Sequence, residues 1–413
     1  MDARDGPSES RDGPVEVAEP IPLLTPADGL PDVVRSGAAL RDLAVSIAAG
    51  QGPIAVDAER ASGFRYSARA YLIQLRREGA GSSLIDPIPI AGRFAPLAEA
   101  LTGPEWVLHA ASQDLPCLAE LGLHPTRLFD TELAGRLAGL PRVGLGPMVE
   151  QLLGLRLEKG HGAADWSNRP LPEDWLVYAA LDVEVLIELR NVLDDLLTRQ
   201  GKRDWAAQEF EAVRTAPPPP PRTDPWRRTS GIHRVRRPRQ LAAVRELWRA
   251  RDELAEQRDI APGRVLPDSA IVEASVTAPT SADDLSKLPV FRGRAQRRLA
   301  SYWWSALHRA ATLPNAELPP TTLTSDGPPP VSRWADRDPE AAARLAAARA
   351  AIAEIGKTYQ LPVENLLQPD LLRRVCWQPP PSVEEALRAG GARDWQVELT
   401  ADPLKQALAV SRD

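Results

Sequence analysis

The first half of the chain alternates short apolar runs with polar turns, which is the pattern of an α/β domain. Apolar runs of β-type residues bounded by Gly, Pro and Asp predict strands. Because several strands come first and later strands alternate with helices, we expect a mixed sheet covered by helices. The predicted strands cover residues 53–59, 71–75, 83–87 and 106–110, and the first predicted helices cover residues 94–101 and 115–121.

Two proline-rich stretches divide the chain. The segment APPPPPR at residues 216–222 is typical of a stiff polyproline linker, and the residues that follow each proline-rich stretch have helical periodicity. We therefore expect one α/β domain followed by two helical bundles. The expected segments are a disordered tail (1–25), the α/β domain (26–215), a Pro/Arg-rich linker (216–236), a helical domain (237–313), a Pro-rich linker (314–330) and a second helical domain (331–413).

Charge differs between the two parts of the chain. Up to Thr215 there are 21 Lys+Arg against 32 Asp+Glu, and from Ala216 onward there are 29 against 24. This asymmetry suggests metal-binding carboxylates in the first part and polyanion binding in the second, although ordinary variation in surface charge would also explain it. No run of about 18 consecutive apolar residues predicts a membrane span. The polar N-terminus and two isolated cysteines, Cys117 and Cys376, indicate a protein of the reducing cytoplasm.

Three acids stand near the predicted strands. Asp57 and Glu59 lie two residues apart on the first strand, so both carboxylates share one face if the strand continues through them. A buried ionised carboxylate costs several kcal/mol unless it is paired or metal-bound. If the strand ends at Val56, both acids are solvated instead. Asp114 begins a helix after the strand at 106–110, where capping alone would explain it, and His109 is expected to be a hydrogen-bonded structural residue.

A fourth acid lies on the predicted helix at residues 173–189. Residues three and four positions apart form one stripe that is apolar except for Asp182 and the hydroxyl of Tyr178. A carboxylate in a core-facing stripe, one turn from a tyrosine, is either a ligand or part of a buried hydrogen bond. The stripe consists of Trp175, Tyr178, Asp182, Val185 and Leu189.

Taken together, these residues resemble the four-acid exonuclease superfamily in its tyrosine branch, with the ribonuclease D family as the nearest match. The resemblance also rests on the segments SLIDP, FDTELAGRLAGL, LGPMVEQLLGLRLEKG and ADWSNRPLPEDWLVYAALDVEVL, and it covers nearly all of residues 26–200. It implies a ribonuclease H-like mixed five-stranded sheet with helices on both faces, followed by two small all-α helical bundles.

The resemblance also implies the site. Asp57, Glu59, Asp114 and Asp182 would hold two divalent cations, Mg²⁺ or Mn²⁺, and Tyr178 would be the catalytic tyrosine. The implied activity is 3′-to-5′ hydrolysis of RNA to nucleoside 5′-monophosphates, in tRNA 3′-end maturation or RNA turnover. The chain departs from close relatives at GHGAA (160–164), where they often carry a Ser/Arg-rich stretch that could contact nucleotides.

The helical region after residue 237 resembles the HRDC domain (helicase and RNase D C-terminal), and residues 344–377 resemble a second, diverged copy. The expected partner is RNA with a free single-stranded 3′ end, such as a tRNA precursor, bound by a monomer. A DNA exonuclease and a catalytically silent RNA-binding protein are the alternatives, but the chain keeps all five site residues. The tryptophans at 303 and 304 are expected to pack in the core, and the candidate RNA-binding residues are Arg292, Arg294, Arg297 and Arg298.

Overall fold

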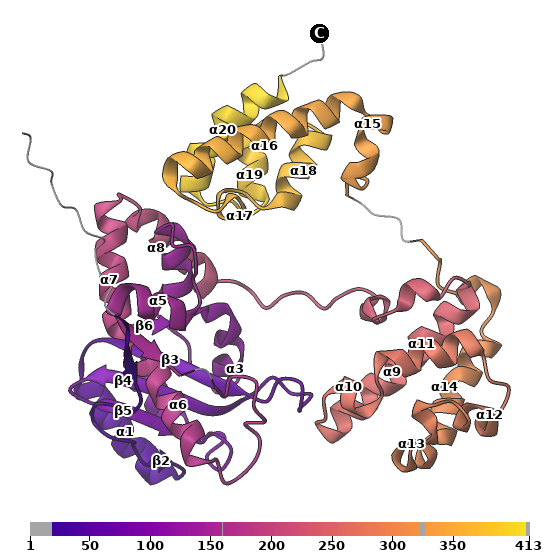
Figure 1. Ribbon diagram of the computed structural model, residues 1–413, viewed down its shortest axis with the longest axis horizontal. Helices are drawn as coiled ribbons and strands as arrows, with labels where there is room; N and C mark the ends of the chain where they lie inside the picture. Colours follow the sequence, from indigo (N-terminus) through magenta and orange to yellow (C-terminus); the bar gives the residue numbers. More distant parts are fainter. Residues whose placement is uncertain (1–18, 159, 323–326, 410–413) are drawn as a thin grey trace, which may run out of the picture.

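The computed structural model describes residues 19–158, 160–322 and 327–409. It consists of an α/β domain (residues 21–214), a first helical domain (residues 225–317) and a C-terminal helical domain (residues 331–408), as Figure 1 shows. Residues 21–23, which we predicted to belong to a disordered tail, form a strand because they pair with residues 155–157. The rest of that prediction up to residue 18 lies outside the described residues. Within the described ranges, no helix is long and apolar enough to cross a membrane.

A six-stranded mixed sheet forms the centre of the α/β domain, in the order β2-β5-β4-β3-β6-β7. Strand β3 is central, antiparallel to β4 and parallel to β6. The resemblance implied a five-stranded sheet, and the apolar runs predicted four strands, which correspond to β3 to β6. The two-residue β2 is too short to give a periodic signal. The strands are β1 (Ile21–Leu23), β2 (Val33–Val34), β3 (Gln51–Arg60), β4 (Ala70–Glu78), β5 (Gly81–Ile85), β6 (Glu105–Leu108), β7 (Arg127–Asp130) and β8 (Leu155–Leu157).

Helices cover both faces of this sheet. Helix α6 contacts β3, β4 and β5, and its buried Ala179 and Ala180 pack with Leu72 of β4. Leu40 of α1 and the next residue of β4, Ile73, belong to a different core cluster, which lies on the other face because neighbouring strand residues point to opposite sides. The helices are α1 (Gly37–Ala49), α2 (Ala95–Ala100), α3 (Leu115–Ala119), α4 (Thr131–Leu137), α5 (Leu145–Leu153), α6 (Glu173–Glu184), α7 (Leu186–Arg199) and α8 (Arg203–Arg214).

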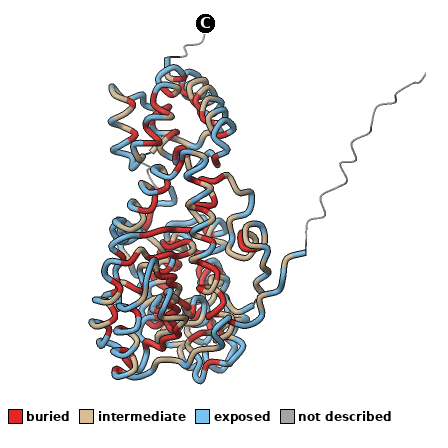
Figure 2. The backbone as a smooth tube through the Cα atoms, turned by 90° about the vertical axis from the view of Figure 1, so that its left-hand side faces the viewer, coloured by how far each residue is buried: buried red, intermediate tan, exposed pale blue. Residues whose placement is uncertain are grey.

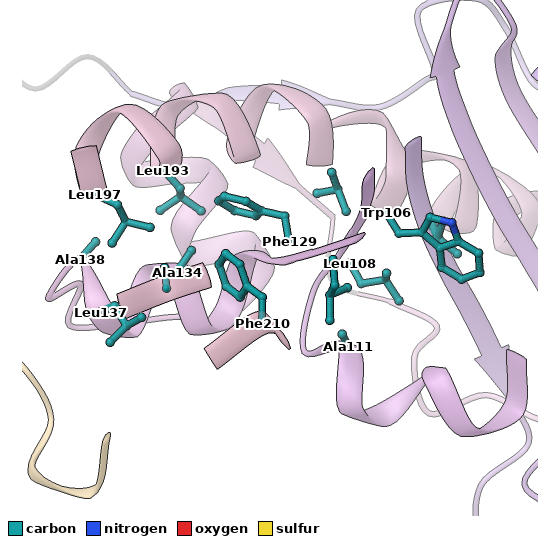
Figure 3. Close-up of a cluster of buried hydrophobic side chains, with 14 of the residues drawn as sticks. Trp106, Leu108, Ala111, Phe129, Ala134, Leu137, Ala138, Leu193, Leu197 and Phe210 are labelled. Carbon is teal, nitrogen blue, oxygen red and sulfur yellow. The ribbon is translucent and has the colours of Figure 1, made fainter. Parts of the chain in front are cut away.

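Aromatic side chains fix α8 against the edge of the sheet. Phe129 of β7 and Phe210 of α8 are both buried, and their ring centroids lie 4.7 Å apart. Figure 3 shows these rings beside Leu193 and Leu197 of α7, with Trp106 of β6 further along the cluster. One face of helix α8 therefore packs into the core of the α/β domain, and the position of the helix relative to the sheet is fixed.

The two helical domains begin with the same arrangement. Helices α9 and α16 are each 21 residues long, and each ends at a residue in the left-handed conformation, Asp259 and Gln360 respectively. A four-residue helix and then a longer helix follow in both cases. The helices are α9 (Pro238–Arg258), α10 (Pro262–Val265), α11 (Asp268–Thr277), α12 (Ala282–Ser286), α13 (Arg294–Arg298) and α14 (Ala300–Thr312), then α15 (Trp334–Arg337), α16 (Pro339–Tyr359), α17 (Val363–Leu366), α18 (Pro369–Trp377), α19 (Val383–Ala389) and α20 (Asp394–Leu408).

The first helical domain also includes part of the predicted linker at 216–236. Residues 225–228 and 232–234 form short 3₁₀ helices, and Trp226 is buried in the core of this domain. The proline and arginine content hid this element, because one tryptophan anchors a segment that has no periodic pattern of its own.

The first helical domain docks on the hairpin between β3 and β4. Asp259 accepts hydrogen bonds from the Ser67 amide at 2.8 Å and from the Arg69 guanidinium at 2.7 Å. The Ala261 amide donates to the Phe64 carbonyl at 2.9 Å, and Arg264 lies over the Phe64 ring at 4.1 Å. The contact thus combines backbone, ionic and aromatic interactions.

The C-terminal helical domain shares a hydrophobic core with the α/β domain. The buried Lys202 ammonium donates to the carbonyls of Leu137 and Tyr359, both at 2.7 Å, and Trp205 stacks on Trp395 at 5.1 Å. Figure 2 shows buried segments in both of these domains. Tyr359 is the last residue of α16 and Asp259 directly follows α9, so in both helical domains the C-terminal end of the first long helix is one of the contacts with the α/β domain.

Candidate active site

Three acidic side chains meet between β3 and α6. Residues Asp57 and Glu59 pair with Gln74 and Leu72 of β4 and therefore share the sheet face that α6 covers. Asp182 comes from α6, and ligand atoms of the three carboxyl groups all lie within 4.8 Å of one another. Strand β3 continues through both acids, so the alternative in which they are solvated beyond the strand end is wrong.

Asp114 belongs to the same region but has a different contact. Its side chain makes no capping hydrogen bond to α3, so the interpretation as a helix cap is wrong. Instead it faces the guanidinium of Arg60, with Nη2 and Oδ1 3.4 Å apart. Asp130 holds the loop before Asp114 by accepting hydrogen bonds from the amides of Ala110 and Ala111. This clamp fixes Ala110 in a left-handed conformation, which directs the chain toward the site.

Burial and mutual repulsion perturb these acids. Burial raises the pKa of Asp57 to about 6. Burial, and then the charges of Asp57, Asp182 and Asp114, raise the pKa of Glu59 to about 9. Burial and the charge of Asp57 raise the pKa of Asp114 to about 8, while the Arg60 cation opposes the shift. The pKa of Asp182 is raised well above its ordinary range by burial and by Asp57.

This crowding of carboxylates fits divalent cations. Hard oxygen donors are the ligands that Mg²⁺ and Mn²⁺ prefer, and positive charge would remove the repulsion that raises the pKa values. The cluster of Asp57, Glu59 and Asp182 supplies such donors from two rigid elements. Two acids that lie two positions apart on a strand, together with one acid of the helix that covers them, are therefore sufficient to form a candidate metal centre.

Tyr178 lies one helical turn before Asp182, and the two side chains perturb each other's pKa. Burial, and then the charges of Asp182, Glu59 and Asp57, raise the pKa of Tyr178 above its ordinary value. The hydroxyl is therefore a neutral donor beside the acids. The candidate cleft, about 440 Å³ in volume, has Tyr178, Asp57 and Asp182 in its lining, together with Arg142 and His109.

His109 has the structural role that we expected. Its Nδ1 lies 3.0 Å from the Thr131 hydroxyl, and burial lowers the pKa of the imidazole to about 4. His109 lines the cleft, but it is not part of the candidate metal cluster in the described residues.

The loop between β8 and α6 lies against Tyr178. A Cβ on Gly162 would lie 3.5 Å from the tyrosine hydroxyl, an ordinary van der Waals distance, and the His161 ring meets the tyrosine ring edge-on at 5.7 Å. This loop contains the GHGAA segment (160–164). Its imidazole lies beside the tyrosine ring, and a Cβ at Gly160 or Gly162 would meet this tyrosine at ordinary contact distances.

Sequence reasoning missed the pair of residues that anchors this loop. The Arg169 guanidinium makes two hydrogen bonds to the carboxylate of Asp86, at 2.7 and 2.9 Å. Nη2 also donates to the Tyr71 carbonyl of β4 at 2.7 Å. Asp86 is the acid of the SLIDP segment, so the motif was visible, but a contact that spans 83 residues leaves no local signal.

The predicted RNA-binding arginines lie far along the chain, around α13 of the first helical domain. All four are exposed, and the ion pairs of the described residues include none of them. Trp303 is fully buried, as we expected, and donates to Gln296 at 2.8 Å. The four arginines therefore remain candidates for phosphate contact: Arg292, Arg294, Arg297 and Arg298.

Comparisons with known proteins match every domain. A model described as 3′-5′ exonuclease matches residues 31–198, and the HRDC domain matches residues 240–307. The last segment, which we predicted to be a second HRDC-like domain, matches a model described as 3′ to 5′ exonuclease C-terminal domain at residues 327–408. The matched order agrees with the domain order in the structure.

Individual relatives agree. Ribonuclease D of Jannaschia sp. is 31% identical over 283 residues, 66% of this chain and 72% of that protein. A crystal structure of a protein from Bifidobacterium adolescentis has a TM-score of 0.90 and 40% identity, covering 95% of this chain and 100% of that one. The structure of Escherichia coli RNase D, described as an exoribonuclease involved in structured RNA processing, has a TM-score of 0.67 and 26% identity, covering 91% and 98%.

The length of the match varies among relatives. The chain spans 61–64% of the length of three other curated ribonucleases D that it matches. It covers 72% of the Jannaschia enzyme and 100% of the Bifidobacterium structure. Since domain order, fold and sequence agree across these comparisons, the chain belongs to the ribonuclease D family.

Proposed function

We propose that the chain is a metal-dependent exonuclease that removes nucleotides one at a time from the 3′ end of RNA. The observation that carries this proposal is the convergence of Asp57, Glu59 and Asp182, with Tyr178 beside them, in the lining of a cleft. A single-stranded 3′ end fits such a cleft, because a duplex would hide its terminal phosphodiester.

The acids have distinct proposed roles. Two divalent cations, Mg²⁺ or Mn²⁺, would activate water and stabilise the leaving oxygen. Asp57, Glu59 and Asp182 would hold the cation on the side of the attacking water, and Asp114 would hold the second cation with help from Asp57. All four acids must lose their protons to act as ligands.

Tyr178 would orient the attacking water. Its raised pKa keeps the hydroxyl neutral, so it can accept from the water and donate to Asp182. The attacking water gives up a proton to solvent as its oxygen bonds to the scissile phosphorus, the bond from phosphorus to the 3′ oxygen breaks, and that oxygen takes a proton from solvent. The products are a nucleoside 5′-monophosphate and a shorter RNA with a new 3′ hydroxyl.

We further propose that the substrate is structured RNA such as a tRNA precursor, bound by a monomer in the cytoplasm. The E. coli relative is described as acting in structured RNA processing. The exposed arginines around α13 would hold phosphates of the RNA body, because Arg neutralises the backbone without reading sequence.

The test is denaturing gel analysis of the purified chain on 5′-labelled single-stranded RNA and matching DNA, with Mg²⁺, Mn²⁺ or chelator. We expect a metal-dependent ladder that shortens from the 3′ end of RNA. Asp57→Ala and Asp182→Ala should each lower the rate by at least about 100-fold, since a metal contributes several kcal/mol to the transition state. Glu188→Ala is the matched control, because Glu188 is an exposed acid on the neighbouring helix.

Each outcome separates the alternatives. Full activity of Asp57→Ala would reject the proposed site. A ladder on DNA alone would replace RNA by DNA as the substrate and leave the site intact. RNA binding without a ladder would indicate a silent binding protein.

A further inference from the structure

The candidate metal centre includes one arginine that the family resemblance did not assign. Arg60 is the last residue of β3 and directly follows Glu59. Its guanidinium lies 3.4 Å from the carboxylate of Asp114, and its side chain is 27% exposed. The same cation stabilises the ionised forms of Asp57, Glu59 and Asp114. Arg60 thus forms an ion pair with Asp114, and its charge lowers the pKa of three of the four acids.

A local change in strand pairing occurs next to Arg60. Glu59 pairs with Leu72 of β4, but Arg60 pairs with Ala70, so Tyr71 has no counterpart on β3. An extra residue of this kind bends a strand and redirects its side chains, and it occurs often beside active sites. Arg60 therefore stands at the point where the regular alternation of β3 is interrupted, within reach of Asp114.

Asp114 differs from the other acids in its partner. The three-acid cluster contains Asp57, Glu59 and Asp182 without Asp114. Asp114 lies outside this cluster and forms an ion pair with the guanidinium of Arg60. Among the described residues, the Nε–H of Arg60 is buried and has no hydrogen-bond partner. A buried donor without an acceptor costs free energy, which an acceptor such as a phosphate oxygen would recover.

The charge balance of the loaded site indicates which acceptor fits. Four ionised carboxylates are neutralised by two divalent cations, and the scissile phosphodiester then adds one negative charge. The guanidinium of Arg60, beside Asp114, supplies a positive charge that balances it. Planar guanidinium groups also match phosphate oxygens in geometry better than ammonium groups do.

We propose that Arg60 is a catalytic residue that holds Asp114 in the metal-free protein, yields Asp114 to the second cation, and then binds a non-bridging oxygen of the scissile phosphate. This inference rests on the proposed exonuclease function. It gives Arg60 two successive partners, a carboxylate and a phosphate, so its removal acts in opposite directions on metal binding and on hydrolysis.

The experiment compares the full-length protein with Arg60→Met and Arg60→Lys. Mn²⁺ binding without RNA is measured by isothermal titration calorimetry, and single-turnover cleavage of a short RNA is measured at saturating Mn²⁺. In Arg60→Met, the Mn²⁺ ion of lower affinity should bind at least about tenfold more tightly than in the wild type, because the guanidinium that competes for Asp114 is absent. It should cleave about 10–100-fold more slowly, because a charge-assisted hydrogen bond to phosphate is lost. Arg60→Lys should bind Mn²⁺ like the wild type and cleave at an intermediate rate.

Arg65→Met is the control, because Arg65 lies on the following loop and its side chain donates to the Ser167 hydroxyl at 2.7 Å, not to an acid of the site. It should change neither measurement. If Arg60→Met weakens Mn²⁺ binding, the arginine only positions Asp114 and the proposal fails. Unchanged cleavage in Arg60→Met overturns it as well. If the wild-type chain does not cleave RNA, the proposed function fails, and the Mn²⁺ titration still decides whether Arg60 competes with a cation.

Discussion

A buried carboxylate of α8 joins the C-terminal helical domain to the α/β domain. Glu209 accepts a hydrogen bond from the Arg393 guanidinium at 2.7 Å and another from the Trp395 indole at 3.0 Å. Its side chain is 7% exposed, and Trp205 stacks on Trp395 beside it. Replacing Glu209 by alanine would leave an arginine and an indole N–H without their acceptor in the middle of the contact.

The cost of Glu209→Ala can be estimated from these contacts. Removing one member of a fully buried ion pair costs about 3–5 kcal/mol. Arg393 is 25% exposed and also donates to the Gly391 carbonyl, so water recovers part of that loss. The indole N–H of the buried Trp395 remains unpaired at a cost of about 1–3 kcal/mol. We expect Glu209→Ala to lower the free energy of unfolding by about 2–4 kcal/mol, and Glu209→Gln by about 1 kcal/mol, because the amide keeps an acceptor.

Urea denaturation followed by tryptophan fluorescence and by circular dichroism tests this estimate. Because the two domains share a hydrophobic core, both signals should shift together to a lower midpoint with an unchanged slope. A loss below about 0.5 kcal/mol for Glu209→Ala, the level of ordinary surface substitutions, would refute the reasoning. So would a fluorescence transition that separates from a circular dichroism transition left at the wild-type midpoint.

Two further predictions concern the metal centre and the other docked domain. Burial raises the pKa of Glu59 to about 9, so the folded protein retains a proton that the unfolded chain loses near 4.5. In chelator, the free energy of unfolding of the wild type should therefore fall as the pH rises from about 4.5 to 9. Thermal unfolding of Glu59→Gln should lack this part of the fall. Parallel pH profiles of the two proteins would contradict the raised pKa of Glu59. Asp259→Asn tolerates the left-handed backbone but removes the carboxylate that binds Ser67 and Arg69. Hydrogen exchange of residues 61–69 should then accelerate several-fold, and unchanged exchange would show that the ion pair does not hold the hairpin.

The sequence predicted the core of the candidate site because its signals are local. Two acids separated by one residue must share a face of a strand, and a tyrosine and an aspartate four residues apart must be neighbours on a helix. Asp57, Glu59, Tyr178 and Asp182 accordingly lie where these periodicities place them. The prediction needed only one fact about the packing of elements, namely that α6 covers the sheet face that Asp57 and Glu59 share.

Contacts between distant segments could not be predicted in this way. Asp114 looked like a helix cap because its local sequence fits one, whereas its actual partner, Arg60, depends on how β3 and the loop after β6 are placed. The contact between Arg169 and Asp86 joins two loop residues 83 positions apart and has no periodic signature. Similarly, the contacts of Asp259 and Lys202, which help to dock the two helical domains, have surroundings that are fixed only by the assembled fold.

The hairpin of β3 and β4 connects the candidate metal centre with the first helical domain. Strand β3 carries Asp57, Glu59 and Arg60, and the turn that follows it carries the Ser67 and Arg69 contacts to Asp259. A substrate phosphate held by arginines of that domain would therefore be placed relative to the metal ligands through one short, hydrogen-bonded element. The proline-rich linker at 216–222 then need not set this distance, because the docked hairpin does. The contact between the hairpin and the first helical domain should therefore set the length of single-stranded RNA between the bound part of the RNA and the candidate active site. This length should change when the contact is weakened, but it should not change when the linker is lengthened.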